Sequence, residues 1–289
     1  MLRPTAEQLR LLTPTERACF AVADTVNRRP AAKRAAHTFL RTVGREWVRL
    51  FTDKLLHVEG LDRLRALDPD RGVFLVSNHR SFFDFYVASS VILRSTSWVE
   101  RMYFPVRSTF FYEGVTGNLV NMVMSAWAMY PPVLRDPDRR AFNQYTVEFL
   151  KEELQRRGTL VGYHPEGSRG KGPDPYALLP SSLGAGAIAY AARPVVLPMF
   201  TLGLINDLPQ QISSNFDGSG APVTLVFGEP LELDEYYAMP DTAETHRALA
   251  ERLRAALVTL GEEERAFRAA RGLPPLGPAV SGDDGARRG

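Results

Sequence analysis

Cysteine is almost absent from this sequence. Cys19 is the single cysteine among 289 residues, which excludes an internal disulfide and a metal centre built on a cysteine cluster. Such scarcity suits a chain that works in a reducing compartment.

The sequence also lacks a large excess of positive or negative charge. The formal net charge of +2 is too small to indicate a nucleic-acid partner. Residues 1–27 lack a basic start followed by a continuous apolar core, so no secretory signal is predicted. Residues 114–134 carry no charge, but Asn118, Asn121, Ser125 and two prolines interrupt them. They predict a buried or interfacial segment in preference to a membrane span.

The hydrophobic pattern alternates between strand and helix along the chain. Short apolar runs closed by turn residues predict strands at residues 55–58, 73–76, 98–106, 159–163, 195–202 and 223–227. Helices are predicted at residues 30–51, 61–67, 82–93, 182–192 and 242–271, and a further helix ends at Gly158. This alternation predicts an α/β fold with a largely parallel central sheet flanked by helices, preceded by an N-terminal amphipathic helical segment.

Four parts of the chain are expected. Residues 1–54 form N-terminal helices in contact with a membrane surface, and residues 55–235 form the α/β domain. Residues 236–271 form a C-terminal helix that packs on this domain. Residues 272–289 are rich in glycine, proline and arginine and are expected to be a disordered tail.

The helix at residues 30–51 has a marked amphipathic pattern. At about 100° per residue, its apolar side chains, Trp47 among them, fall on one arc. The opposite side carries four arginines: Arg34, Arg41, Arg45 and Arg49. Eight basic and two acidic residues between Arg28 and Lys54 give a local net charge of +6. The pattern suits the surface of an anionic membrane, and it suits equally a helix packed on the core with a solvated basic face.

The segment 72–86 holds the first candidate site. A buried strand is followed by His79 in a turn and by Asp84 in the first turn of the next helix. From that position the carboxylate can reach back to the imidazole, which is how a general base is oriented. The same spacing recurs at His57 and Asp62 without the preceding apolar strand, so this second copy is interpreted as incidental.

A second strand-end loop carries the other unusual chemistry. Gly167, Gly170 and Gly172 allow close backbone approach, and Arg169 and Lys171 supply positive charge. This mixture suits a phosphate group, although a flexible basic surface loop has the same composition. Ligands of parallel sheets bind beyond the carboxyl ends of the strands. Both loops are therefore expected at one site.

Two blocks together carry a family resemblance: Asn78-His79-x-Ser81-x-x-Asp84 and, about eighty residues later, Pro165-Glu166-Gly167-Ser168-Arg169. In this order they resemble the glycerolipid acyltransferases, which include lysophosphatidate and glycerol-3-phosphate acyltransferases. The resemblance covers roughly residues 55 to 230. The family's third block usually begins Phe-Pro-Glu-Gly-Thr-Arg, so His164 replaces the Phe and Ser168 the Thr. Placing the arginine of the second block at Arg135 leaves Met129 and Pro132 where the family has Gly and Phe.

The resemblance implies roles for these residues. His79 removes the proton of the acceptor hydroxyl, Asp84 fixes the His79 tautomer, and the alkoxide attacks the thioester directly. The expected substrate-binding residues are Glu166, Gly167, Ser168, Arg169, Arg135, Asn78 and Ser81. The backbone amides from Asn78 to Ser81 are candidates for holding the oxyanion.

The implied reaction uses acyl-CoA or acyl-carrier protein as donor and requires no metal or other cofactor. The expected acceptor is 1-acylglycerol 3-phosphate, giving phosphatidic acid, with glycerol 3-phosphate or another lipid as alternatives. A non-catalytic lipid-binding protein on the same scaffold is the alternative of a different class. The expected location is cytoplasmic, peripheral on the inner face of an anionic membrane.

Overall fold

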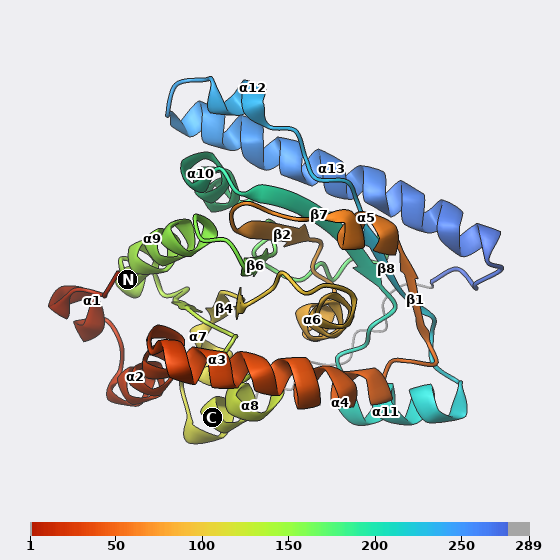
Figure 1. Ribbon diagram of the computed structural model, residues 1–289, viewed down its shortest axis with the longest axis horizontal. Coiled ribbons are helices and arrows are strands. Elements are labelled where there is room, and N and C mark those ends of the chain that lie inside the picture. Colours follow the sequence, from red (N-terminus) through yellow and green to blue (C-terminus); the bar gives the residue numbers. More distant parts are fainter. Residues whose placement is uncertain (1, 277–289) are drawn as a thin grey trace.

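The computed structural model describes residues 2–276 and has the predicted α/β fold (Figure 1). Its strands are β1 (Leu56–Glu59), β2 (Val73–Ser77), β3 (Arg101–Tyr103), β4 (Val106–Arg107), β5 (Pro132–Val133), β6 (Thr159–Tyr163), β7 (Val195–Leu202) and β8 (Val223–Phe227). Its helices are α1 (Ala6–Arg10), α2 (Pro14–Arg28), α3 (Pro30–Phe39), η1 (Leu40–Gly44), α4 (Arg45–Leu50), α5 (Leu61–Ala66), α6 (Asp84–Ser95), α7 (Ser108–Phe111), α8 (Val115–Ser125), η2 (Pro137–Arg139), α9 (Phe142–Leu154), α10 (Leu183–Ala192), α11 (Leu208–Asp217), α12 (Asp234–Tyr237) and α13 (Ala243–Ala270).

The central sheet has six strands in the order β1-β8-β7-β2-β6-β3. All neighbouring pairs are parallel except β7 and β8, so the predicted largely parallel sheet is confirmed. Every residue of β2 is buried, as its continuous apolar run requires of a central strand covered on both faces. A separate pair, β4 and β5, is also parallel.

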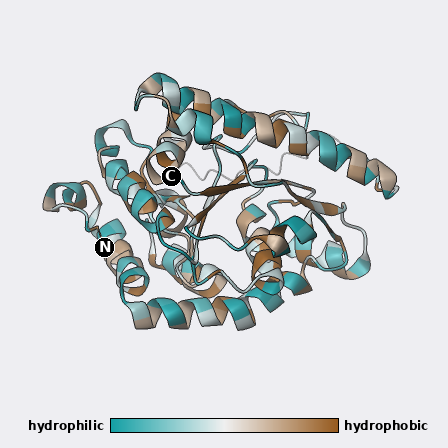
Figure 2. Ribbon diagram, turned by 45° about the horizontal axis from the view of Figure 1, so that its top comes forward, coloured by the Kyte–Doolittle hydropathy of each residue, from teal (hydrophilic) through white to brown (hydrophobic). Residues whose placement is uncertain are grey.

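Helices enclose the sheet from both sides. In Figure 1, α10, α12 and α13 lie along one side, and α6 lies on the other with α3 and α4 outside it. Figure 2 shows the strands as the apolar interior and the helices as mixed in hydropathy. The predicted C-terminal helix is α13. It packs closely on α10 because Gly186 has no Cβ, which would stand 1.8 Å from the His246 carbonyl oxygen.

The basic N-terminal helix differs from its predicted pattern. Residues 30–50 are helical, but η1 is a turn of π-helix that shifts the phase between α3 and α4. The Arg41 guanidinium points into the protein and donates to the carbonyl oxygens of Thr96 and Val99, each at 3.0 Å. Arg45 reaches the Leu93 carbonyl oxygen at 3.4 Å. These two arginines therefore cap the carboxyl end of α6 instead of joining an outward basic face.

The other predicted membrane-contact residues, Arg34, Arg49 and Trp47, differ in their exposure. Arg34 is exposed, and Arg49 is half-buried beside Glu46 at 3.0 Å. Trp47 is half-buried and packs against Phe51 with ring centroids 5.0 Å apart. The apolar side of this helix is thus packed on the protein core through Trp47 and Phe51, as in the second of the two predicted arrangements.

The uncharged segment 114–134 begins with the eleven-residue helix α8 and continues through β5. No helix among residues 2–276 is long and apolar enough to cross a membrane. Helix α11 was not predicted, although Asp207 caps its start by accepting from the Gln210 amide at 2.9 Å. Of the predicted tail, residues 277–289 lie outside the part of the chain that the structure describes.

Candidate active site

The two predicted loops meet at the carboxyl edge of the sheet. Strands β2 and β6 are parallel neighbours, with Val76 paired to Tyr163, so the chain leaves both strands at the same place. The main chain of His79 joins the loops directly. Its amide donates to a Glu166 oxygen at 2.9 Å, and its carbonyl oxygen accepts from the Gly170 amide at 2.9 Å.

The structure brings His79 and Asp84 together as the spacing predicted. His79 Nδ1 lies 3.1 Å from Asp84 Oδ2. The same oxygen accepts from the backbone amides of Arg80 and Ser81, each at 3.0 Å. Since Asp84 begins α6, its carboxylate closes the turn between β2 and the helix. A carboxylate with three donors on one oxygen fixes the position of His79 Nδ1 and the tautomer of the imidazole.

Burial sets the protonation of this pair. It lowers the pKa of His79 to about 3, with further lowering by the positive charges of Arg169 and Arg135. Burial raises the pKa of Asp84 to about 6, opposed by His164 and by the amides of Ser81 and Arg80. At neutral pH the imidazole is therefore neutral and the carboxylate is ionised, which are the states that a His-Asp general base requires.

Three of the predicted substrate-binding side chains brace the loops instead of lining the cavity described below. The Asn78 amide pairs with both the N–H and the C=O of Thr201 on β7, at 2.8 and 2.9 Å. Ser81 Oγ donates to the Ile205 carbonyl oxygen at 3.3 Å. The second Glu166 oxygen accepts from the Leu179 amide at 2.7 Å. These side chains fix the loops by hydrogen bonds to main-chain atoms.

The suggested oxyanion donors are also engaged elsewhere. The amides of His79, Arg80 and Ser81 all point at the carboxylates of Glu166 and Asp84. For these three amides, this corrects the expectation that they face the reacting carbonyl. The turn uses them to hold its two carboxylates, a requirement that sequence alone does not reveal.

Basic side chains surround the other end of the site. The Arg135 guanidinium donates to the Gly167 carbonyl oxygen and, at 3.0 Å, to Ser168 Oγ, so it lies beside the second loop. Four basic residues line one cavity with His79: Arg107, Arg135, Arg169 and Lys171. Arg107 was not predicted. The sequence feature that could have indicated Arg107 is its position just after a predicted strand. In the structure, β4 ends beside β5 and brings Arg107 towards Arg135.

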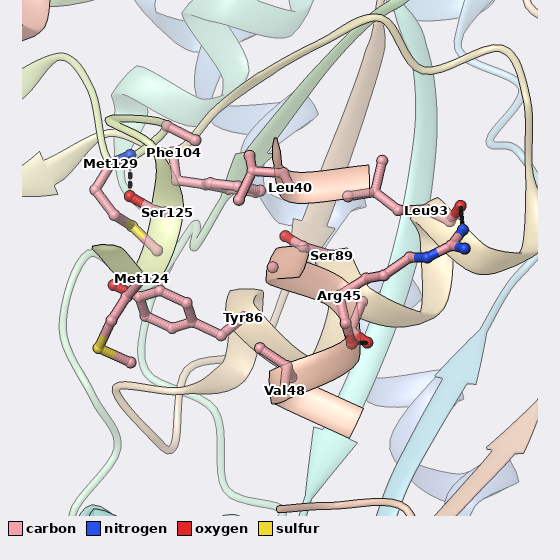
Figure 3. Close-up of a pocket in the computed structure, with 13 residues that line it drawn as sticks. Leu40, Arg45, Val48, Tyr86, Ser89, Leu93, Phe104, Met124, Ser125 and Met129 are labelled. Carbon is pink, nitrogen blue, oxygen red and sulfur yellow. Dashed lines mark hydrogen bonds between the residues drawn. The ribbon is translucent and has the colours of Figure 1, made fainter. Parts of the chain in front are cut away.

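The cavity that contains these residues has a volume of about 420 Å³. Its remaining wall is largely apolar and includes Phe82, Phe85 and Phe110. A second, small apolar pocket of about 20 Å³ shares three lining residues with it: Tyr86, Phe104 and Met129. Figure 3 shows this pocket between α6, the helix of η1 and α4, and the end of α8. The site therefore combines a base, a group of cations and an apolar wall.

His164 lies against the base. Its ring stacks on the His79 ring with centroids 3.8 Å apart and planes within 10°. Ligating atoms of His79, Asp84 and His164 fall within 4.8 Å of one another. However, a metal lies in the plane of each imidazole that binds it, and two nearly parallel stacked rings have no shared plane. In this arrangement the three groups are a stacked pair with a carboxylate, and metal binding would require at least one ring to turn.

Comparisons with known proteins point to one family. A family model described as Acyltransferase matches residues 55–201. Among solved structures, the chain is similar to the 1-acyl-sn-glycerophosphate acyltransferase from Thermotoga maritima, with 18% identity and a TM-score of 0.54. The match covers 86% of this chain and 88% of that one, and at this identity it supports the fold alone. No curated protein matches the sequence.

Proposed function

Because this chain belongs to the acyltransferase family, whose model covers just over half of it, we propose that it moves a fatty acyl group from a thioester donor to a lysophospholipid hydroxyl. The acceptor we propose is 1-acylglycerol 3-phosphate, which gives phosphatidic acid, and the donor is acyl-CoA or acyl-carrier protein. One observation carries the proposal: the His79–Asp84 pair opens onto a cavity lined by four cations and an apolar wall.

The proposed reaction follows from the orientation of His79. With Nδ1 bonded to Asp84, Nε2 is the nitrogen left to take the acceptor hydroxyl proton. The hydroxyl oxygen then bonds to the thioester carbonyl carbon and forms a tetrahedral intermediate. When this collapses, the C–S bond breaks and the thiolate leaves with the proton from His79. Asp84 stabilises the imidazolium that exists between the two proton transfers.

The two ends of the cavity suit the two ends of the acceptor. A phosphate monoester favours arginine because the guanidinium offers paired donors to its oxygens. Arg135 and Arg107 approach from the β4–β5 side, and Arg169 lies on the opposite loop. The apolar wall of the cavity, formed by Phe82, Phe85 and Phe110, suits the acyl chain of the acceptor. These features favour an acceptor that carries a phosphate over a neutral lipid.

We propose that the protein binds to the cytoplasmic, inner face of a membrane. Three residues form an exposed stripe on α8, a helix without a charged residue: Val115, Leu119 and Val123, at 79%, 53% and 52% exposure. Phe110 of α7 is exposed and also lines the cavity, so the apolar surface continues to its mouth. In Figure 1, α3 and α4 lie on the same side as α8, and of their basic side chains Arg34 is exposed and Arg49 is half-buried. This combination suits an anionic bilayer.

Vesicle sedimentation tests the membrane surface. Leu119→Glu should abolish binding to phosphatidylcholine vesicles that contain phosphatidylglycerol. Val258→Glu is the matched control, since Val258 is 42% exposed on α13 on the other side of the molecule. Arg34→Gln tests the basic helix separately and should weaken binding only at low salt. Unchanged binding by Leu119→Glu would remove α8 from the proposal.

An acceptor screen with purified protein and labelled acyl-CoA tests the activity. His79→Ala should lose at least ~10³-fold in turnover of 1-acylglycerol 3-phosphate, because base and oriented pair are both removed. His57→Ala is the matched control, since His57 has the same spacing to an aspartate but lies on the edge strand β1. Turnover of glycerol 3-phosphate alone would favour that acceptor instead. Lipid binding without His79-dependent turnover would favour the non-catalytic alternative.

A further inference from the structure

His164 is fixed by a hydrogen bond to the main chain and by ring stacking. It follows β6 directly, beside the end of β2, and its Nδ1 lies 3.1 Å from the Ser77 carbonyl oxygen. A carbonyl oxygen only accepts, so Nδ1 carries the proton and donates it. The neutral ring therefore has one tautomer, tied to the main chain of the strand that carries His79.

The ring also belongs to a column of four stacked rings. Phe104 stacks on Phe85 with centroids 5.0 Å apart, Phe85 on His164 at 4.0 Å, and His164 on His79 at 3.8 Å. Gly162 on β6 makes room for the column, because a Cβ there would stand 2.5 Å from the Phe104 ring and 2.9 Å from the Phe85 ring. Phe85 and Phe104 are both buried, so the far end of the column is fixed in the core.

We propose that His164 is a positioning residue for the His79 base, and that it sets the plane of the His79 imidazole by stacking on it. The inference rests on the proposed function. The hydrogen bond to Asp84 fixes one atom of the His79 ring but leaves rotation about that bond free. The stacked face of His164 removes this freedom, so Nε2 stays aimed into the cavity while Nδ1 meets Asp84.

The protonation of His164 is consistent with this role. Burial, together with the nearby His79, lowers the pKa of His164 to about 3. It is therefore neutral at cellular pH and adds no positive charge beside the imidazolium that His79 becomes. At this position the glycerolipid acyltransferases usually have Phe. Its ring can stack on His79 but cannot donate a hydrogen bond to the Ser77 carbonyl oxygen. Stacking is the property that the two residues share.

Steady-state kinetics of two variants test the inference. His164→Ala removes the stacked ring, and we expect kcat to fall by ~10- to 100-fold with the acceptor KM changed less than about twofold. His164→Phe keeps the ring and should recover at least half of the loss on a logarithmic scale. A kcat for His164→Ala within about twofold of the wild type would overturn the inference, as would His164→Phe being as slow as His164→Ala.

A double-mutant cycle with Asp84→Asn separates positioning from a structural effect. If both residues act through the His79 ring, the double variant should be no more than about threefold slower than Asp84→Asn alone. Independent, fully additive losses would contradict the inference. Should His164→Ala fail to fold, Phe85→Leu breaks the same column and should also lower kcat, and an unchanged kcat would count against it. A fully active His79→Ala would instead overturn the proposed function.

Discussion

Asp84→Asn separates the proposed chemistry from the fold. Asp84 is 1% exposed, and its Oδ2 accepts from His79 and from two backbone amides. Asparagine keeps an oxygen for those amides but has no charge. When His79 becomes an imidazolium, opposite charges about 4 Å apart in an effective dielectric constant of about 20 attract by roughly 4 kcal/mol. Loss of this attraction should lower kcat by ~10³-fold.

The same substitution should not weaken the fold. Burial raises the pKa of Asp84 from its ordinary 3.8 to about 6. Ionised Asp84 at pH 8 therefore costs the folded state about 3 kcal/mol, and the neutral amide avoids this cost. The folded wild type binds the proton more tightly than the unfolded chain, so its penalty disappears as the pH falls through 6. The two proteins should become equally stable towards pH 4.

Two measurements check this prediction on one pair of proteins. The first is kcat at saturating acceptor and donor, and the second is the free energy of unfolding in urea at pH 8, 6 and 4. We expect a variant that is more stable at pH 8 and nearly inactive. If Asp84→Asn unfolded more easily at pH 8 and kept more than about a tenth of kcat, Asp84 would be a structural residue and the reasoning would fail.

Three further substitutions address other parts of the site. Glu166→Gln leaves one buried amide, of His79 or Leu179, without its acceptor, and should lower the free energy of unfolding in urea by about 1–3 kcal/mol. Arg135→Gln removes a positive charge near His79, so the acidic limb of kcat/KM should move to higher pH while the acceptor KM rises about tenfold. Ser89→Phe overfills the small pocket of about 20 Å³, so it should lower the free energy of unfolding in urea by about 1–3 kcal/mol while the acyl-chain preference stays unchanged in a chain-length series.

Local sequence pattern predicted much of the fold. Strands β6, β7 and β8 begin and end at the predicted residues, because each is a short apolar run between clear turn signals. The pairing of His79 with Asp84 was predictable for the same reason, since a strand, a turn and a helix start determine it. Side-chain partners across the fold were not predictable. Glu166 meets Leu179 and the His79 amide through the packing of two loops, which no spacing encodes.

The basic helix shows where periodicity fails. A projection at a constant angle assumes regular α-helix, and the π-turn η1 breaks that assumption in the middle of the segment. Arg41 then turns towards the carbonyl oxygens of Thr96, at the end of α6, and of Val99, in the loop that follows it. The demand for donors to these oxygens comes from a distant part of the chain. Conversely, the exposed stripe of α8 could not be predicted. Its segment has no charged residues that would distinguish an exposed helix face from a buried one.

The position of the cations links acceptor binding to the base. Arg169 and Arg135 line the proposed phosphate site, and both lower the pKa of His79. A bound phosphate places negative charge beside them and so weakens their effect on the imidazole. The pKa of His79 should consequently rise when a phosphate-bearing acceptor is present, and stay low with a neutral one. An acceptor without the phosphate then meets a weaker base as well as a weaker binding site, so the cavity selects its substrate in kcat as well as in KM.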